Sequence, residues 1–483
     1  MVHKNNLVAA THGQTGDLAD RVVVGNQHPI FEQGEYILVV LNRALRAEDN
    51  AVIDAAIAHA NILGLPILVY SELDEAAPYA SDRLYYFALG AFRELARALG
   101  NSGIASIQAI KTAKDPDLLL VLAEKAAAIY TDEEPTHWDK LKLNRLLDLA
   151  QQTVFLVDAS RLIPIRALPP QLRTTKAFRK AHGELREQYV ASRKETTARL
   201  AAEKNKLRTE LSLNESQTFD SQNFAHYSNK ALLALLAKSD INHDIPISAE
   251  HPPTQTELTN RIKTLQESIL ARYKWIRNNP ALVHSTSQLS PYLHFGMTGP
   301  HQLFAAIENA DIPKTYTWKF RDEFLTWREW SHYQAFYNPD IHQFESLPNS
   351  AQKTLNAHAE DKRPEFTGKE DIVSGNTPDT TWNAAQREWV STGWLHNNLR
   401  MYWAKQFLRF TATPQSAWEI ACYVNDYFSL DGRDPATYAS MRWAFGDAKP
   451  GYSEKEIYGW VAPKSDSAIL KRKGMREWIE ARQ

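Results

Sequence analysis

Short apolar runs alternate with helix-like repeats in the first third of the chain, and this alternation constrains the fold more than any other feature. The runs lack a regular polar face, which is typical of parallel strands covered by helices on both sides. Five runs are predicted strands: residues 36–41, 66–70, 105–110, 128–131 and 153–157. Four stretches between them are predicted helices: residues 49–63, 81–99, 116–127 and 138–151. The pattern predicts a Rossmann-like α/β domain with a doubly wound parallel sheet over residues 35–162.

From residue 256 onward the apolar spacing is that of helices throughout. The predicted helices are residues 256–279, 299–309, 317–337, 380–392, 397–410, 414–427 and 435–443. We therefore predict an all-helical domain over residues 256–483. Weak periodicity predicts a flexible N-terminal arm over residues 1–34, and residues 163–255 form a basic and polar connector.

The connector is strongly basic in its first half. Between residues 171 and 210 it has eleven Lys or Arg and five Glu, a net charge of +6. Such a stretch is either a solvated helix or linker, or a patch that follows nucleic-acid phosphates. The sequence leaves both interpretations open.

Composition narrows the class of protein. Of 483 residues, 43% are hydrophobic, as in ordinary globular domains. Cys422 is the one cysteine, which excludes an internal disulfide, an iron–sulfur cluster and a thiolate zinc site. We predict no metal site, no membrane span and a reducing, cytoplasmic setting. The 55 basic and 57 acidic residues give a net charge of −2, which neither requires nor excludes a nucleic-acid partner.

The turn after the first predicted strand has no phosphate-binding fingerprint. Residues 42–50 contain no glycine, so the backbone there cannot approach a pyrophosphate closely. Any cofactor of the α/β domain is therefore expected to bind in another way.

Tryptophan is concentrated in the C-terminal half, where twelve of the thirteen indoles occur. Four of them fall within 22 residues: Trp382, Trp389, Trp394 and Trp403. Aromatic residues at helical spacing usually belong to a core, but a series of indoles can also relay electrons to a redox cofactor. In the same half, Glu323 and Trp327 share one helical face. That pair is either a surface carboxylate beside a core indole or part of a pocket for a planar ring.

Two polar segments interrupt the apolar helices. Residues 284–290 gather Ser and Thr hydroxyls before a predicted helix, where they either cap the helix or bind phosphate oxygens. Residues 424–435 combine carboxylates, an amide and a glycine, which form either a helix-capping loop or a polar binding site.

Together these stretches resemble the photolyase/cryptochrome family, and specifically its class II cyclobutane pyrimidine dimer photolyase branch. The matching segments are residues 46–50, 292–296, 323–327, 336–339, 401–405 and 425–435. The resemblance implies that residues 35–162 form an antenna-type domain and that residues 256–483 bind FAD. It implies an enzyme, a light-driven lyase that repairs cyclobutane pyrimidine dimers in DNA. A blue-light photoreceptor (cryptochrome) on the same scaffold is the alternative.

The resemblance also implies roles for individual residues in cofactor binding. The FAD phosphates and ribitol would be held by Tyr273, Thr286, Ser287, Leu289 and Ser290. Arg400 and Asp431 match a salt bridge beside the isoalloxazine ring, Asn425 matches the residue that faces flavin N5, and Asp434 would lie near the adenine or the flavin edge. An amide suits the position of Asn425, because it can accept a hydrogen bond from a protonated N5 without itself titrating.

The implied substrate is a dimer flipped out of the duplex into a pocket beside the reduced flavin, which donates one electron when excited by blue light. Trp327 and Trp443 match the apolar walls of that pocket, and Met401 would pack against the dimer. Glu323 matches the carboxyl that hydrogen-bonds the pyrimidine carbonyls, and we expect it to be buried. The protein is expected to act as a monomer.

The chain departs from the class II pattern at two places. Trp403 and Trp382 match the first two members of a tryptophan relay that photoreduces the flavin, but Phe410 stands where the third is expected. Because phenylalanine is much harder to oxidise than an indole, Trp389, Trp394 or Tyr402 would have to substitute. Leu41-Asn42 also replaces a Trp-Met pair, and the sequence does not reveal whether a deazaflavin or folate antenna binds.

Overall fold

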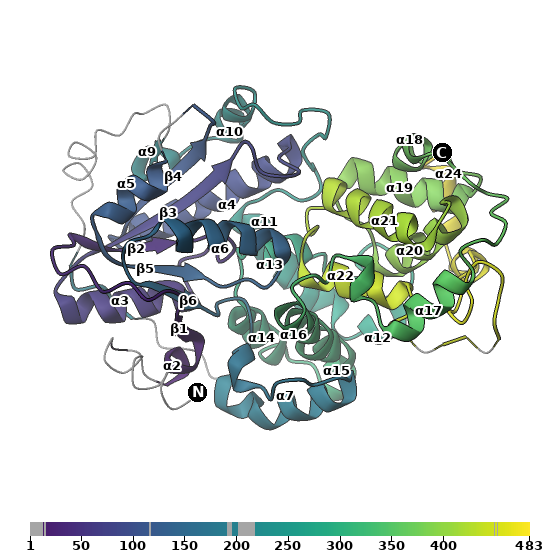
Figure 1. The fold of residues 1–483 in the computed structure, drawn as a ribbon, viewed down its shortest axis with the longest axis horizontal. Helices are drawn as coiled ribbons and strands as arrows, with labels where there is room; N and C mark the ends of the chain where they lie inside the picture. The colour runs from purple at the N-terminus through teal and green to yellow at the C-terminus, as the bar shows by residue number, and fades with distance from the viewer. Residues whose placement is uncertain are drawn as a thin grey trace.

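The computed structural model describes residues 13, 16–114, 117–190, 196–200, 218–448, 450, 451 and 453–483. It has two lobes that lie side by side (Figure 1). One lobe is built on a sheet and the other consists of helices. Helices α6, α11 and α13 lie between the two lobes in this view.

The first lobe contains a seven-stranded sheet in the order β1-β6-β5-β2-β3-β4-β7. Its strands are β1 (Val22–Val24), β2 (Tyr36–Val40), β3 (Ile67–Asp74), β4 (Ala105–Lys111), β5 (Ala126–Asp132), β6 (Val154–Val157) and β7 (Thr218–Asp220). The five inner strands run parallel and are the five predicted from the sequence. Leu38 of the fully buried β2 pairs with both Leu68 and Ile129, which confirms the doubly wound arrangement.

Helices cover both faces of this sheet (Figure 1). They are α3 (Ala51–Leu63), α4 (Asp82–Asn101), α5 (Leu118–Glu124) and α6 (His137–Leu149). The boundary between α5 and β5 differs from the prediction, because Ala126 and Ala127 belong to the strand. Alanine favours helices, but the pairing of Ala126 with Tyr36 on β2 overrides that local preference.

The predicted N-terminal arm is ordered in part. Residues 17–24 form α2 (Asp17–Arg21) and β1, which pairs antiparallel with β6. The buried Arg21 guanidinium donates hydrogen bonds to the carbonyl oxygens of Arg161 (2.8 Å) and Leu162 (2.7 Å). The prediction of a flexible arm is wrong for these residues, because the segment is too short to show periodicity. Backbone carbonyls that are distant in sequence hold it in place.

The connector contains η1 (Ile165–Ala167), α7 (Thr175–Tyr189), α9 (Ser221–Phe224) and α10 (Asn229–Leu236). Helix α7 packs through Phe178 against Trp330 and Tyr333 of the helical lobe. On its outer side Arg179 pairs with Asp322 at 2.9 Å, whereas Lys180 is exposed. Residues 191–195 and 201–210 of the predicted basic stretch, and residues 211–217 after it, lie outside the described residues.

The second lobe is all-helical, as predicted. Its first part contains α11 (Gln255–Thr264), the π-helical turn η2 (Leu265–Ile269), α12 (Tyr273–Ile276), α13 (Ser290–His294), α14 (Pro300–Glu308), α15 (Lys314–Asp322), the π-helical turn η3 (Glu323–Arg328) and α16 (Glu329–Tyr337). Its second part contains η4 (Phe344–Ser346), α17 (Asn349–Ala357), α18 (Lys369–Ser374), α19 (Thr380–Thr392), α20 (Asn397–Phe410), α21 (Pro414–Phe428), α22 (Pro435–Ala444), α23 (Ser467–Leu470) and α24 (Met475–Glu480).

Two helices predicted as continuous, 256–279 and 317–337, each contain a π-helical turn instead. Such turns occur often at functional sites, and the apolar spacing of a sequence does not reveal them. The core of this lobe is rich in indoles, with Trp382, Trp389, Trp403 and Trp418 fully buried. Among the described residues, no helix is long and apolar enough to cross a membrane.

Candidate active site

The loop between α21 and α22 holds a buried ion pair. Arg400 of α20 donates to Asp431 Oδ1 at 2.9 Å, and Ser429 Oγ donates to the same oxygen at 2.6 Å. Both charged side chains are 8% exposed. Burial alone would raise the pKa of Asp431, but the Arg400 charge and hydrogen bonds from Ser290 and Ser429 lower it below its usual value. The loop therefore holds a fixed negative charge beside a fixed positive one.

Asn425 lies at the end of α21, next to this loop, and is fully buried. Its Nδ2 donates to Asp426 Oδ1 at 3.0 Å, but its Oδ1 has no hydrogen-bond partner. Asp426 in turn accepts from the Tyr438 hydroxyl at 2.7 Å, which fixes the orientation of the amide. A buried amide oxygen without a partner costs about 1–3 kcal/mol, which makes this oxygen a candidate contact for a bound group.

A second unpartnered buried oxygen, Thr286 Oγ1, lies in the Ser/Thr segment. Four residues later, Ser290 begins α13, and its Oγ accepts from Trp394 Nε1 at 3.2 Å. Ser290 also hydrogen-bonds Asp431, which joins this segment to the ion-pair loop. The fold therefore brings together two polar segments that lie about 140 residues apart in sequence.

The other predicted cofactor residues lie around this point. Ser287 is partly buried, and Leu289 is buried directly before α13. Tyr273 is buried, with its ring edge-on to Phe320 at 5.0 Å between centroids. Asp434 caps the N-terminus of α22, where its carboxylate accepts from the Ala436 backbone N–H at 2.9 Å. Segments 273, 286–290, 400 and 425–434 all belong to the helical lobe.

Glu323 begins the π-helical turn η3 and is 28% exposed, so the expectation of a buried carboxyl is wrong for this structure. It lies between two cations, Arg277 at 2.7 Å and Lys319 at 2.8 Å. Lys319 is four residues earlier on the same helix, a pairing that the sequence spacing could have indicated. Arg277 comes from the segment after α12 and carries no sequence signal.

The predicted pocket walls are open to solvent. Trp327 is 36% exposed and Trp443 is 41% exposed. Trp327 lies in η3 and Trp443 in α22, and these two elements pack together. Met401 is partly buried on α20. Lys405 lies with its Nζ 5.8 Å from the Trp443 ring centroid and donates to the carbonyl oxygen of Ala444 at 2.9 Å, a support that sequence reasoning missed.

Three of the four predicted relay indoles form one buried cluster. Trp403 and Trp382 stack with centroids 6.0 Å apart and an angle of 7° between planes, and Trp389 meets Trp403 edge-on at 4.7 Å. Phe410 lies edge-on to Trp382 at 5.4 Å, so a buried phenyl ring follows the indole stack. Trp394 instead packs against two histidines near Ser290.

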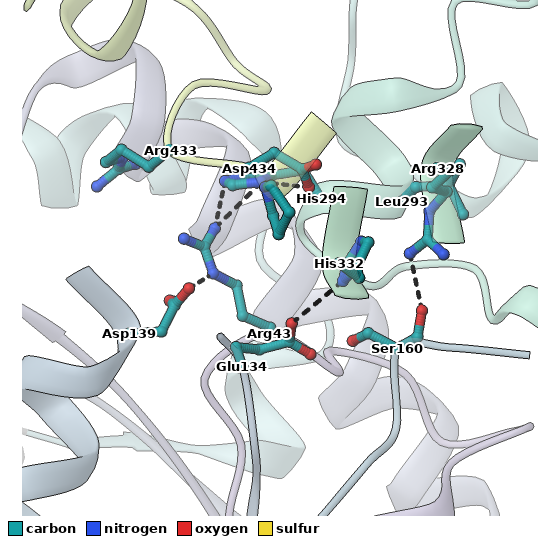
Figure 2. Close-up of a pocket in the computed structure, with 11 residues that line it drawn as sticks. Arg43, Glu134, Asp139, Ser160, Leu293, His294, Arg328, His332, Arg433 and Asp434 are labelled. Carbon is teal, nitrogen blue, oxygen red and sulfur yellow. Dashed lines mark hydrogen bonds and ion pairs between the residues drawn. The ribbon is translucent and has the colours of Figure 1, made fainter. Parts of the chain in front are cut away.

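A small, partly open pocket lies at the junction of the two lobes and is lined mostly by charged side chains (Figure 2). Arg43, which follows β2, donates to Asp139 at 2.8 Å and contacts the His294 ring. His294 Nδ1 lies 3.2 Å from Asp434. Burial and the Arg43 charge lower the pKa of His294 to about 4, so a neutral imidazole links the α/β domain to Asp434.

The glycine-free turn at 46–50 also joins the two lobes. The Arg46 guanidinium donates to the carbonyl oxygens of Ala159 (2.8 Å) and Gly296 (3.3 Å), and Asn50 caps α3. Asp49, with a positive φ of 50°, accepts from the His301 backbone N–H at the start of α14. Side chains of the turn therefore hold it against the start of the helical lobe.

Comparison with known proteins shows similarity along nearly the whole chain. No protein-family model matches the sequence. Deoxyribodipyrimidine photo-lyase of Methanothermobacter thermautotrophicus is 27% identical over 449 residues, which cover 93% of this chain and 94% of that protein. The sequence and the archaeal enzyme therefore align over nearly their whole lengths.

Solved structures share the fold. A bacterial class III photolyase from Agrobacterium tumefaciens superposes with a TM-score of 0.64 at 18% identity, covering 93% of this chain and 86% of that one. The Synechocystis sp. PCC6803 cryptochrome gives 0.63 at 17% identity, covering 92% and 88%. The chain is therefore similar in sequence to a photo-lyase along nearly its full length, and it shares the fold of solved photolyase and cryptochrome structures.

Proposed function

We propose that this protein is a class II photolyase, a carbon–carbon lyase that splits cyclobutane pyrimidine dimers in DNA under blue light. The observation that carries the proposal is the buried, unpartnered Oδ1 of Asn425 beside the Arg400–Asp431 ion pair. The similar archaeal protein is named a deoxyribodipyrimidine photo-lyase. We further propose that the protein acts as a cytoplasmic monomer.

The residues of the helical lobe fit FAD. Thr286 Oγ1 and Asn425 Oδ1 are buried acceptors that lack partners, and a bound flavin nucleotide offers N–H and hydroxyl donors to both. Arg400 and Asp431 would flank the ring system, and Tyr273, Ser287, Leu289 and Ser290 would line the rest of the site. Reduced FAD would supply the light-excited electron. The residues themselves supply position and a fixed electrostatic environment.

The surface beside Glu323 fits DNA. Trp275 is 59% exposed and Trp318 47% exposed, and Lys274 Nζ lies 5.5 Å and 5.9 Å from their ring centroids. Exposed aromatic rings between cations bind bases and phosphates together. Trp327 and Trp443 would then enclose a dimer flipped from the duplex, a step that costs less for a poorly stacked lesion.

In this arrangement Glu323 would exchange partners on binding. Its carboxylate is now paired with Arg277 and Lys319. Displacement of these cations toward DNA phosphates would free the carboxyl to hydrogen-bond the pyrimidine carbonyls. Glu323→Gln would then lower the repair rate while leaving the protein folded, since the side chain is partly exposed.

Repair of a thymine-dimer oligonucleotide tests the proposal. The flavin is first reduced chemically and the sample is illuminated with blue light, with a dark control. Light-dependent loss of the dimer is expected. Absence of repair by protein that contains fully reduced flavin would refute the lyase assignment.

Phe410 favours a second candidate, a blue-light photoreceptor of the cryptochrome type. A phenyl ring follows Trp382 where an oxidisable indole would continue the relay, so photoreduction would follow another route. A photoreceptor predicts reversible, light-driven flavin reduction with no loss of dimer, even after chemical pre-reduction. The same oligonucleotide assay separates the two candidates.

A further inference from the structure

Two histidines and an aspartate from distant segments meet where the lobes join. His137 begins α6 in the α/β domain, and Asp340 and His342 lie between α16 and η4 in the helical lobe. Their ligand atoms all lie within 4.8 Å of one another. The two imidazole rings stack with centroids 4.5 Å apart and 25° between their planes. The cluster therefore joins segments about 200 residues apart in sequence.

His342 is prepared to donate a lone pair. Its Nδ1 is shielded from solvent and has no hydrogen-bond partner. An imidazole nitrogen that carries no proton is the form of histidine that binds metal ions. The Asp340 carboxylate accepts one long hydrogen bond, from Gln343 at 3.4 Å, and is otherwise open on the surface.

The backbone around the cluster is already held in place. The carbonyl oxygen of His342 accepts from Trp418 Nε1 at 2.7 Å. On the other side, Trp138 follows His137 and donates through Nε1 to the Tyr438 hydroxyl at 2.9 Å. Both supporting bonds end in the helical lobe, so the three side chains are presented by anchored segments.

We propose that His137, Asp340 and His342 bind one divalent transition-metal ion of the zinc type, which fastens the α/β domain to the helical lobe. Two imidazoles and one carboxylate are a common protein ligand set for Zn²⁺, with water completing a tetrahedron. Zinc–ligand bonds of about 2.0–2.2 Å place ligand atoms no more than about 4 Å apart, so small rotations of the side chains close the site. Figure 1 shows α6 at the boundary between the lobes, where such an ion would act.

Calorimetric titration of the full-length, tag-free protein with Zn²⁺ tests the proposal. Wild type is expected to bind one ion per chain at this site and to melt at a higher temperature with the metal than without it. Asp340→Asn changes an exposed side chain and leaves the fold intact. It is expected to weaken zinc binding at least about tenfold, because loss of even an outer partner of a metal ligand costs that much.

His342→Ala and His137→Ala are expected to abolish the zinc-dependent rise in melting temperature. His358→Ala is the matched control, since His358 lies between Asp361 and Glu454 and can itself attract zinc. That control is expected to keep both the binding and the rise. Equal zinc binding by wild type and the Asp340→Asn and His342→Ala variants, or loss of binding in His358→Ala alone, would overturn the proposal. The readouts require neither light nor DNA, so they are independent of the photolyase assignment.

Discussion

Replacing Asp431 by asparagine tests whether the buried ion pair with Arg400 holds the helical lobe together. Both side chains are 8% exposed, so the substitution leaves a buried guanidinium without its counter-ion. Breaking such a pair costs about 3–5 kcal/mol. The new amide can still accept the Ser429 hydrogen bond, which contributes about 1 kcal/mol. The expected loss in the free energy of unfolding is therefore at the lower end of that range, about 3 kcal/mol.

The assay is unfolding followed by tryptophan fluorescence, since twelve of the thirteen indoles lie in the C-terminal half. For a domain of about 150–250 residues, a loss of about 3 kcal/mol lowers the melting temperature by about 6–12 °C. Asp447→Asn is the control, because Asp447 pairs with Arg442 at 3.2 Å but is 32% exposed. Its expected cost is below about 1 kcal/mol.

The pH dependence gives a second readout. Because the pKa of Asp431 is lowered in the folded protein, its contribution is complete above the ordinary aspartate value of about 4 and is lost as the pH falls below it. The difference between wild type and Asp431→Asn is therefore expected to shrink at acid pH. If Asp431→Asn and Asp447→Asn proved equally stable at pH 7, the reasoning from burial would be refuted.

Three further perturbations follow from the structure. Trp403→Phe is expected to abolish photoreduction of bound flavin, measured by absorbance under blue light, while chemically reduced protein still repairs dimers; normal photoreduction would contradict the relay. Burial raises the pKa of Glu134 to about 8, so this group costs stability as the pH rises from about 4 toward 8. Glu134→Gln is therefore expected to melt higher than wild type at pH 9 but not at pH 4, and a constant difference would argue against the shift. Gly296 has a φ of +69°, and a Cβ there would lie 1.9 Å from the Arg43 carbonyl oxygen, so Gly296→Ala is expected to prevent stable folding. Gly103→Ala, also at positive φ but with open space around it, is expected to cost about 1 kcal/mol, and equal effects in a melting assay would refute the steric argument.

Local pattern was sufficient for the architecture. The five inner strands were predictable because strands buried on both faces must be apolar along their length, as Tyr36–Val40 is. The all-helical lobe was predictable for the same reason, since one face of each helix must be apolar. The edge strands β1 and β7 were not, because three-residue strands are defined by their pairing partners rather than by periodicity.

Parts of the candidate site could also be predicted. Arg400, Asp431 and Asn425 were singled out through the family resemblance, and the structure brings the first two within 2.9 Å. Their roles toward a flavin remain predictions. The expected burial of Glu323 was wrong, because exposure depends on how η3 packs and on two cations that its own motif does not include.

The sequence by itself determined the fold class and which faces of its strands and helices are apolar, because both properties follow from the short-range spacing of apolar residues. Tertiary structure alone decided which distant groups meet. Arg43 and His294, or His137 and His342, lie more than 200 residues apart, and neither member of a pair carries a local signal of the other. The physical reason is that hydrophobic burial depends on how much apolar surface leaves water and not on the direction of any contact. Hydrogen bonds and ligand contacts, by contrast, depend on the final positions of individual atoms.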